Sequence, residues 1–188
     1  MDEVGAARDA LRRFVLTYGA KPPPVDVDEL AESLCRLRVR RADDLSALPG
    51  APVGAALSGL LLADRHEVWV SRHEPWERRR FSVAHEVGHF LLHAGSVGDR
   101  VFCRVGDLRP DPESPERVRE REANRFAAEL LMPEDMVRAE ADRRGPDPFA
   151  LGEAFRVSAL AMGYRLVNLG YFEELPVDLE EERRKWSG

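Results

Sequence analysis

Apolar residues recur every three to four positions over several stretches of the chain, a spacing that predicts amphipathic helices. One such stretch runs from Val4 to Tyr18 and stops before a glycine and three prolines. Asp26 and Glu29 have the spacing of a capping box, which predicts a short helix that extends through Leu34. The N-terminal part of the chain is therefore expected to form two helices.

After these helices the apolar period shortens to two. Leu37 and Val39 alternate with arginines, residues 53–57 form a short apolar run, and residues 68–70 form another after a polar turn. These segments predict a small, mostly antiparallel sheet. We expect the strand around Val68–Ser71 to lie at an edge of the sheet, where it could accept an extended peptide by strand addition.

The helical period returns at Pro75 and holds to about His93. Residues 96–113 are rich in Gly, Pro and Asp, and we expect them to form a connecting loop. Ser114 and Pro115 are residue types that favour the N-cap and the first position of a helix, so a further helix is predicted there. It ends where Pro133 follows Met132.

The remaining residues predict shorter helices. One spans residues 134–143, and a pair lies on either side of a turn at Val157 and Ser158 and ends near Gly170. A charge-dense tail follows from Leu179. With 188 residues in all, the chain suits one compact α+β domain, or one domain with a small appendage.

Composition and charge narrow the class of protein. Hydrophobic residues make up 44% of the chain and charged residues 33%, a balance typical of globular proteins. The formal charge of −6 argues against electrostatic binding of nucleic acid. The longest apolar stretch, Ala51 to Ala63, is interrupted by Pro52 and Gly59 and is too short to span a membrane. With two cysteines and no secretory signal, we expect a cytoplasmic protein without disulfides.

Three of the five histidines lie within nine residues, and two of them belong to the H-E-x-x-H pattern His85-Glu86-Val87-Gly88-His89. At about 100° per residue, His85 and His89 lie about 40° apart on the predicted helix, so both can reach one metal ion. Glu86 lies about 100° from His85, beside the ligands, where a general base is needed. The opposite side of the helix is apolar and is expected to pack on the core; its residues are Val83, Ala84, Val87, Phe90 and Leu91.

A catalytic zinc ion needs a third protein ligand and an open fourth position. His93 is one candidate, but a third imidazole one turn further along a straight helix points away from the shared site. We therefore expect His93 to support the site through hydrogen bonds or to lie at the helix end, with ligation as the alternative.

The helix predicted after Ser114 offers carboxylates instead. Its apolar face is centred about 55° from Glu120 and about 105° from Glu122, so Glu120 borders the buried side and is the better ligand. Glu122 remains the alternative. Asn124 lies one turn beyond Glu120 on the same face, where it can hydrogen-bond a ligand.

Two segments, Phe81 to His93 and Glu120 to Pro133, resemble the ImmA/IrrE family of metallo-endopeptidases. The resemblance extends to residues 24–34 and 155–170, so it covers most of residues 22–172. It implies a zincin-like α+β fold with a small antiparallel sheet, an active-site helix and a helix-turn-helix-like C-terminal segment. On this basis we expect a metallopeptidase domain, a helix-turn-helix-like subdomain and a charged tail, at residues 1–145, 146–172 and 173–188.

The same resemblance implies a zinc peptidase of thermolysin-like type, which in bacteria and their mobile elements cleaves or inactivates a repressor with an XRE-type DNA-binding domain. By position, His85 and His89 match the family's histidine ligands, Glu120 its glutamate ligand and Glu86 its catalytic glutamate. We expect the repressor to be a separate protein, because a fused DNA-binding or sensor domain does not fit within this length. No motif identifies the residue that stabilises the oxyanion, and three residues are candidates: Tyr164, Arg165 and Tyr171.

The leading hypothesis is zinc-dependent hydrolysis of a peptide bond in a repressor, which would derepress stress-response or mobile-element genes. Glu86 would take a proton from the attacking water and pass it to the leaving amine. The alternative is a regulatory module that binds a repressor or antitoxin without cleaving it and uses the metal as a staple. A structural zinc site is normally closed by four protein ligands and has no use for Glu86. Direct DNA binding through residues 148–170 is disfavoured, because that segment has only two arginines.

Overall fold

The computed structural model describes residues 2–20, 22–48, 51, 57–93, 100–104 and 114–179. The chain forms two compact units, and each contains more than one segment of the sequence. The first unit comprises Met1–Ala20 and Asp26–Leu130, and the second comprises Lys21–Val25 and Leu131–Gly188. The division expected at residue 145 stays a prediction. No helix in the described segments is both long and apolar enough to cross a membrane.

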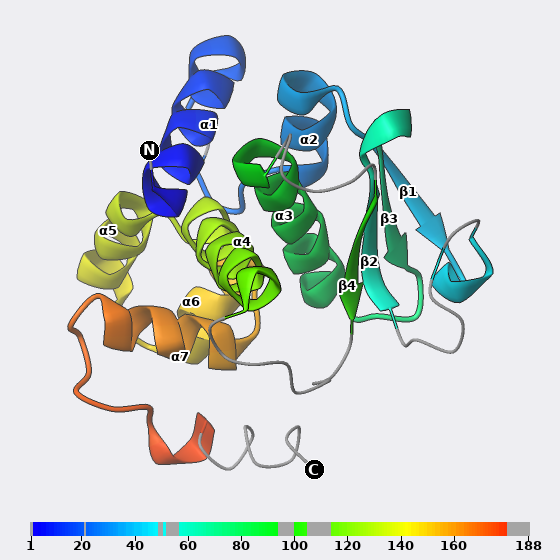
Figure 1. The fold of residues 1–188 in the computed structure, drawn as a ribbon. Helices are drawn as coiled ribbons and strands as arrows, with labels where there is room; N and C mark the ends of the chain where they lie inside the picture. The colour runs from blue at the N-terminus through cyan, green and yellow to red at the C-terminus, as the bar shows by residue number, and fades with distance from the viewer. Residues whose placement is uncertain are drawn as a thin grey trace. The chain divides into compact units, whose positions relative to one another are not determined.

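A small mixed sheet forms one side of the first unit (Figure 1). In the described residues its strand order is β1-β3-β2-β4. The pair β1 and β3 is parallel, whereas β3 with β2 and β2 with β4 are antiparallel, so the sheet is mostly antiparallel, as predicted. The strands are β1 (Arg38–Ala42), β2 (Leu57–Leu62), β3 (Glu67–Ser71) and β4 (Arg100–Arg104).

The strand expected at the sheet edge lies in its interior. Within β3, Val68 pairs with Val39 of β1 on one side and with Leu61 of β2 on the other. The prediction that this strand could accept an extended peptide is therefore wrong, because neighbouring strands already bond both of its sides. Alternation of apolar residues shows which side chains face the core, here Val68 and Val70, and carries no information about lateral neighbours.

The expectation of a connecting loop over residues 96–113 also needs correction. β4 lies within this segment and pairs with β2, with a register shift between Leu57 and Gly59. The segment contains a short apolar run at residues 101–103, whose signal is outweighed by the glycines, prolines and aspartates around it. Residues 94–99 and 105–113 lie outside the described residues, and so does the helix stop expected at Gly95.

The predicted helices of the first unit form close to their expected positions. Asp26 caps the second helix by accepting a hydrogen bond from the backbone N–H of Glu29 at 3.0 Å. The hydroxyl of Ser114 accepts one from the N–H of Arg117 at 3.4 Å and starts the fourth helix. The helical elements are α1 (Glu3–Tyr18), α2 (Val27–Cys35), α3 (Trp76–His93) and α4 (Pro115–Leu131), with short 3-10 turns η1 (Leu45–Ala47) and η2 (Ala63–Arg65).

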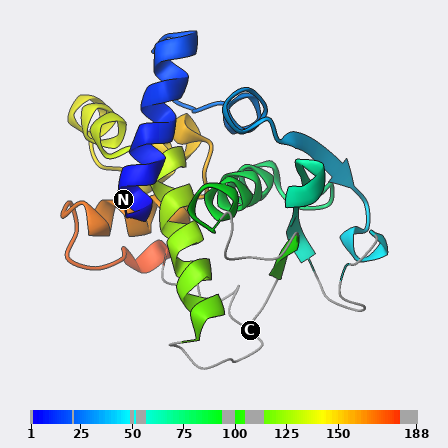
Figure 2. The same cartoon turned by 45° about the horizontal axis from the view of Figure 1, so that its top comes forward.

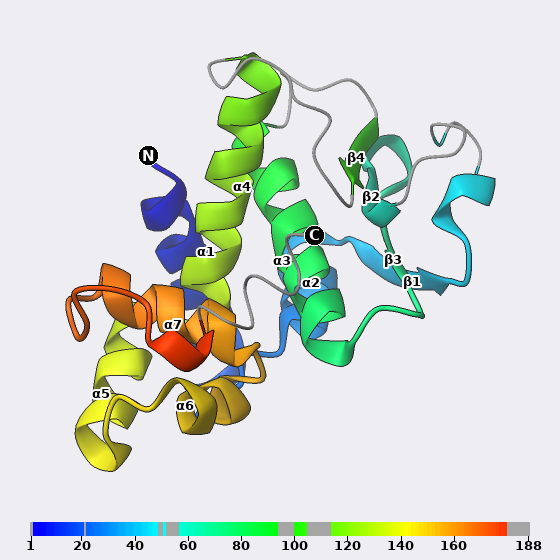
Figure 3. The ribbon, with the colours of Figure 1, turned by 90° about the horizontal axis from the view of Figure 1, so that it is seen from below.

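Helix α3 lies between the sheet and α4 (Figures 1 and 3). Every residue from Ser82 to His89 is buried, so the middle of the helix is enclosed on all sides. The packed face expected from the helical wheel is confirmed at Val83, Ala84 and Val87, each at most 1% exposed. Leu91 is 37% exposed, contrary to expectation, because a wheel gives a direction but not how far neighbouring elements extend along the helix.

Helix α1 is held against α4 by ion pairs, and the two helices run side by side in Figure 2. The guanidinium of Arg8 contacts the carboxylate of Glu129 at 2.8 Å, and Arg125 contacts Glu3 at 3.0 Å. Because Glu129 is only 3% exposed, the first of these pairs is the better shielded from solvent.

The second unit contains the helices α5 (Glu134–Arg144), α6 (Pro148–Phe155) and α7 (Ala159–Asn168). Ser158 caps α7 by accepting a hydrogen bond from the N–H of Ala161 at 3.1 Å. Leu175 and Leu179 follow α7 and pack at Gly163, where an added Cβ would lie 2.5 Å from Leu179 Cδ1. This close packing explains why Leu179 is fully buried. Residues 180–188 of the expected charged tail lie outside the described residues.

Candidate metal centre

Two imidazoles from α3 converge at the middle of the first unit. His85 and His89 are one helical turn apart, and their Nε2 atoms are 3.0 Å from each other. Their exposed fractions are 1% and 3%, because the sheet and α4 enclose this part of α3. Burial lowers the pKa of His89, against the effect of a hydrogen bond with Glu120. His89 is therefore kept in the neutral form that can bind a metal.

Helix α4 brings Glu120 to the two histidines. Its carboxylate lies 3.3 Å from His85 Nε2 and 3.1 Å from His89 Nε2. Burial works to raise the pKa of Glu120, but hydrogen bonds from His85 and His89 outweigh it and hold the pKa at about 2. The carboxyl group is therefore ionised at neutral pH. Of the two glutamates considered from the sequence, the structure places Glu120 with the histidine pair.

Asn124 orients the first histidine. Its Oδ1 lies 3.0 Å from His85 Nδ1, on the opposite side of the ring from Glu120. Because an amide oxygen only accepts hydrogen bonds, this contact places a ring proton on Nδ1, so Nε2, which faces Glu120, is the nitrogen left to bind a metal ion. The expectation that Asn124 contacts a candidate ligand agrees with this geometry. No such contact is found for His89, whose buried Nδ1 has no hydrogen-bond partner among the described residues.

His93 and Glu122 lie beside the cluster and face each other. His93 Nε2 is 3.4 Å from the backbone oxygen of Arg119 and 3.7 Å from a carboxylate oxygen of Glu122. Among the described residues, the group whose donor atoms come together is His85, His89 and Glu120, without His93 or Glu122. The geometry thus favours the supporting position that the helical wheel gave His93.

Glu86 is fully buried, and neither of its carboxylate oxygens has a hydrogen-bond partner among the described residues. Burial raises its pKa to about 8; His85 opposes this shift and the negative charge of Glu120 adds to it. A buried carboxylate without partners is destabilising, and such groups are concentrated at functional sites.

Sequence reasoning missed one neighbour of this carboxylate. Gly59 of β2 has no side chain where Glu86 Oε1 lies, and an added Cβ would be 2.7 Å from that oxygen. In the sequence, Gly59 stands out only as an interruption of an apolar stretch. A glycine within a strand can mark a close approach, but the sequence does not show which group approaches it.

The three converging side chains fit a metal ion. Two imidazole nitrogens and a carboxylate oxygen form the donor set, with all three atoms within 4.8 Å of one another. Imidazole and carboxylate are donors for divalent transition-metal ions. The two histidine nitrogens lie at hydrogen-bond distance, 3.0 Å, beside an ionised carboxylate. A bound cation would satisfy all three groups at once.

The three candidates for oxyanion stabilisation belong to the second unit. Arg165 donates a hydrogen bond from Nε to the backbone oxygen of Met132 at 3.0 Å. The guanidinium carbon of Arg138 lies over the ring of Tyr171, 5.7 Å from the ring centroid. Tyr164 is 44% exposed. None of these contacts gives one candidate preference over the others, and their role stays a prediction.

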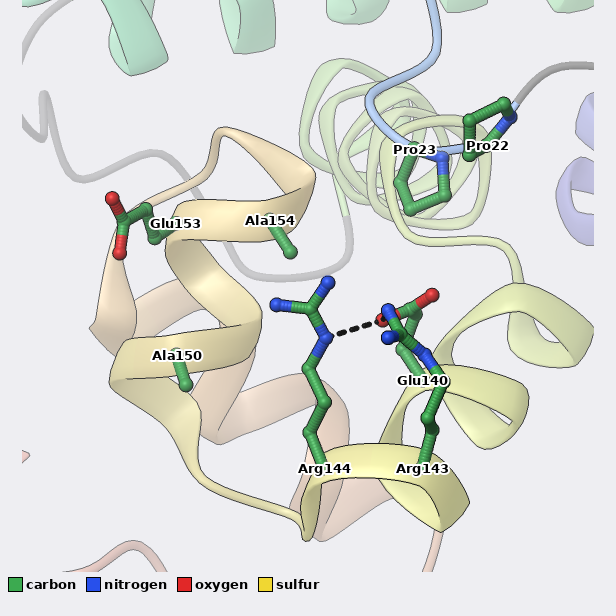
Figure 4. Close-up of a pocket in the computed structure, with 8 residues that line it drawn as sticks. All are labelled: Pro22, Pro23, Glu140, Arg143, Arg144, Ala150, Glu153 and Ala154. Atoms are coloured by element: carbon green, nitrogen blue, oxygen red, sulfur yellow. Dashed lines mark hydrogen bonds and ion pairs between the residues drawn. The ribbon is translucent and has the colours of Figure 1, made fainter.

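A separate pocket of about 380 Å³ also belongs to the second unit (Figure 4). Two arginines in its wall, Arg143 and Arg144, both contact the carboxylate of Glu140, at 2.6 and 2.8 Å. Their charge is thus partly offset within the wall, and the pocket brings no metal-binding or nucleophilic set together. The complete lining is Pro22, Pro23, Glu140, Arg143, Arg144, Ala150, Glu153 and Ala154.

The fold has a counterpart among solved structures. A structure described as a Mycobacterium tuberculosis transcriptional regulator matches 87% of this chain and 46% of that chain, with a TM-score of 0.56. Sequence identity is 22%, so this likeness shows the fold alone.

Sequence comparison gives two curated relatives, each named radiation response metalloprotease IrrE. The protein of Deinococcus deserti is 32% identical over 168 residues, which are 87% of this chain and 54% of the relative. The protein of Deinococcus radiodurans is 31% identical over 170 residues, 80% of this chain and 49% of the relative. The chain therefore spans about half the length of the curated relatives it matches.

Residues 50–167 match the model of a peptidase family described as the IrrE N-terminal-like domain. The match covers more than half of the chain and includes the converging side chains of α3 and α4. It confirms the resemblance drawn from residues 81–93 and 120–133. The chain belongs to the IrrE N-terminal-like domain family of peptidases.

Proposed function

We propose that this protein is a zinc-dependent endopeptidase that hydrolyses a peptide bond in a regulatory protein. The observation that carries the proposal is the convergence of His85, His89 and Glu120 next to the buried carboxylate of Glu86, which has no hydrogen-bond partner among the described residues. Family membership supports a metallopeptidase role, since the relatives are named metalloproteases.

His85, His89 and Glu120 would hold the zinc ion. The two histidine Nε2 atoms lie 3.0 Å apart, and one oxygen of Glu120 lies 3.1 Å from His89 while its other oxygen lies 3.3 Å from His85. Two histidines and one glutamate also form a known ligand set of catalytic zinc, which leaves a fourth position open. When bound, zinc supplies Lewis-acid activation of water and of the scissile carbonyl.

Glu86 would act as the general base and then the general acid. Its oxygens make no hydrogen bond to described residues, so they are available to accept a proton from water. Burial raises its pKa to about 8, so without a cation nearby the group is mostly protonated at pH 7. A cation held by His85, His89 and Glu120 would favour the ionised form, which is the form that accepts the proton. The same group can then deliver the proton to the leaving amine.

The substrate we propose is an XRE-type helix-turn-helix repressor encoded separately, whose cleavage would derepress stress-response or mobile-element genes. A DNA-bound repressor would meet the protease in the cytoplasm. The formal charge of −6 supports an encounter with the repressor rather than with its DNA. The word "radiation" in the names of the relatives supports a link to stress.

Glu86→Gln tests the proposal, because the amide keeps the shape of the side chain but cannot accept the proton. We expect the variant to keep one zinc per chain and to lose cleavage of a purified candidate repressor. Gel electrophoresis and mass spectrometry of the repressor measure the cleavage. Glu77→Gln, in the first turn of the same helix, is the matched control and should cleave normally.

Two results would count against this mechanism. Undiminished cleavage by the Glu86→Gln variant would remove Glu86 from its role. A repressor that is released from DNA but stays intact, with wild-type protein and zinc present, would instead support the non-proteolytic module in which the metal is a structural staple.

A further inference from the structure

Gly59 occupies a position where its residue type needs a reason. It lies in the middle of β2, between Leu57 and Leu62, and pairs with Val70 of β3. Glycine weakens a strand interior because it loses more backbone entropy on folding and adds no side chain to the packing. The backbone does not require it, since Gly59 is not among the residues with positive φ. The register shift beside it does not require glycine either, because that requirement arises at positive φ. The remaining reason is space.

The space belongs to one side chain. The three atoms nearest to an added Cβ at Gly59 are Oε1, Cδ and Cγ of Glu86, at 2.7, 3.5 and 3.5 Å. Two of these distances are ordinary contacts, but 2.7 Å is closer than a Cβ and an oxygen can approach. An alanine at this position would push the carboxylate away from β2, or push β2 away from α3.

Glu86 has little freedom to give way. It is fully buried, and so are all residues of α3 from Ser82 to His89. Neither of its oxygens has a hydrogen-bond partner among the described residues, so no such bond draws the carboxylate away from β2. The backbone of Gly59, which has no side chain, therefore sets how closely the Glu86 carboxylate approaches β2. His85 and Glu120 of the cluster are close enough for their charges to act on this carboxylate.

We propose that Gly59 is a positioning residue: by lacking a side chain, it sets how far the Glu86 carboxylate stands from the His85, His89 and Glu120 cluster. This inference rests on the proposed role of Glu86 for its catalytic consequence. The steric contact itself is independent of any activity.

The contact is tested by a double-mutant cycle in the stability of the metal-free protein. Gly59→Ala should lower the melting temperature in the wild-type and in the Glu86→Gln background, because the amide keeps the bulk. In the Glu86→Ala background the decrease should disappear or reverse, since the contacting atoms are gone and alanine suits a strand better than glycine. Additive effects in all backgrounds would overturn the proposal.

A second glycine serves as the control. An added Cβ at Gly88 would meet the ring of Phe126 at 3.0 Å, and no atom of Glu86 is among its nearest neighbours. Gly88→Ala should therefore have the same effect on melting temperature with and without Glu86→Ala. Equal coupling at Gly59 and Gly88 would show that the Gly59 effect is not specific to the contact, and would also overturn the proposal.

The catalytic consequence is measured by peptide cleavage with zinc bound. Gly59→Ala should lower kcat on the order of 100-fold, the effect of misplacing a reacting group by about 1 Å, with KM and zinc stoichiometry unchanged. Glu86→Asp, which shortens the side chain, should restore part of the rate in the Gly59→Ala background. An unchanged kcat would contradict the positioning role. If the wild type cleaves nothing, the proposed function fails, while the stability cycle still decides whether Gly59 positions Glu86.

Discussion

Two glutamates two positions apart on α4 have different surroundings. Glu120 faces His85 and His89, which hold the pKa of its carboxyl at about 2 against the effect of burial. Glu122 faces His93 at 3.7 Å. Both side chains are 38% exposed, so it is the direction of the side chain, not its burial, that separates a candidate metal ligand from its neighbour.

This difference predicts which glutamate controls metal affinity. Glu120→Gln should weaken zinc binding by more than the roughly 10–100-fold loss typical of residues that only support a ligand, because it removes a donor. Glu122→Gln is the matched control and should change zinc affinity by less than about threefold. Isothermal titration with zinc measures both, and the reverse order of effects would make Glu122 the ligand.

Cys35 shows how burial governs chemistry away from the site. Its side chain is 6% exposed, and burial raises the pKa of the thiol to about 11, against the effect of the Arg13 charge. At pH 8 such a thiol is thiolate in roughly one molecule in a thousand, against about one in four for an ordinary cysteine.

We therefore expect iodoacetamide at pH 8 to alkylate Cys35 at least about 100-fold more slowly in the folded protein than in denaturant. The rate should rise about tenfold per pH unit between pH 8 and 10, because the thiolate is the reactive form. Peptide mass mapping separates this residue from Cys103. Rapid alkylation of the native protein would show that Cys35 is accessible and not perturbed.

At the scale of elements, the site depends on how closely α3 and α4 approach. Gly88 of α3 faces the backbone of Ala123 and the ring of Phe126, and both of these α4 residues are fully buried. With an added Cβ the distances would be 3.3 Å to Ala123 Cα and 3.0 Å to the ring. The absence of a side chain at Gly88 thus lets α4 bring Glu120 to the histidines.

Gly88→Ala has two opposing effects on stability. The tight contact with α4 costs about 1–3 kcal/mol, whereas alanine in a helix interior stabilises by about 1 kcal/mol relative to glycine. The net change is therefore small, but Glu120 shifts with α4. We expect zinc affinity to fall about tenfold or more.

The control is Gly152 in the other unit, whose added Cβ would meet its neighbours at similarly short distances. An added Cβ at Gly152 of α6 would lie 3.1 Å from the backbone oxygen of Val157. Gly152→Ala should affect stability without altering zinc affinity. An unchanged affinity in the Gly88→Ala variant would show that the approach of α4 does not limit the metal centre.

At the scale of the whole molecule, the predicted helix-turn-helix-like segment favours DNA binding, whereas the net charge argues against it. The sequence predicts a helix-turn-helix-like segment over the residues that form α6 and α7, and in DNA-binding proteins this motif carries basic side chains. Here Arg165 binds the backbone oxygen of Met132, and Arg138 and Arg143 contact glutamates. The formal charge of the chain is −6.

We therefore expect the purified protein not to retard duplex DNA in a gel at 50 mM salt, where phosphate contacts are strongest. The control is the substrate repressor, which should retard its own operator under the same conditions. Retardation by this protein that disappears between 50 and 200 mM salt would revive direct DNA binding.

Predictions from the sequence were most reliable for features that residues within one element determine, such as the start of a helix. The helix bounds near Asp26, Ser114 and Ser158 follow from caps within a few residues, and the structure confirms them. The order of strands was not predictable in this way. β3 is interior because β1 and β2 happen to flank it, and β4 was hidden in a segment of turn-forming residues.

The sequence by itself determined the histidine pair and the candidate base. In an H-E-x-x-H helix the two histidines share one face and the glutamate lies beside it, whatever the rest of the fold. It also favoured Glu120 over Glu122, because the apolar face of α4 shows which side turns inward. Only the tertiary structure decided that His93 faces Glu122, and that Gly59 of a distant strand bounds the space of Glu86. Such contacts depend on how elements pack, and periodicity along one element carries no information about its neighbours.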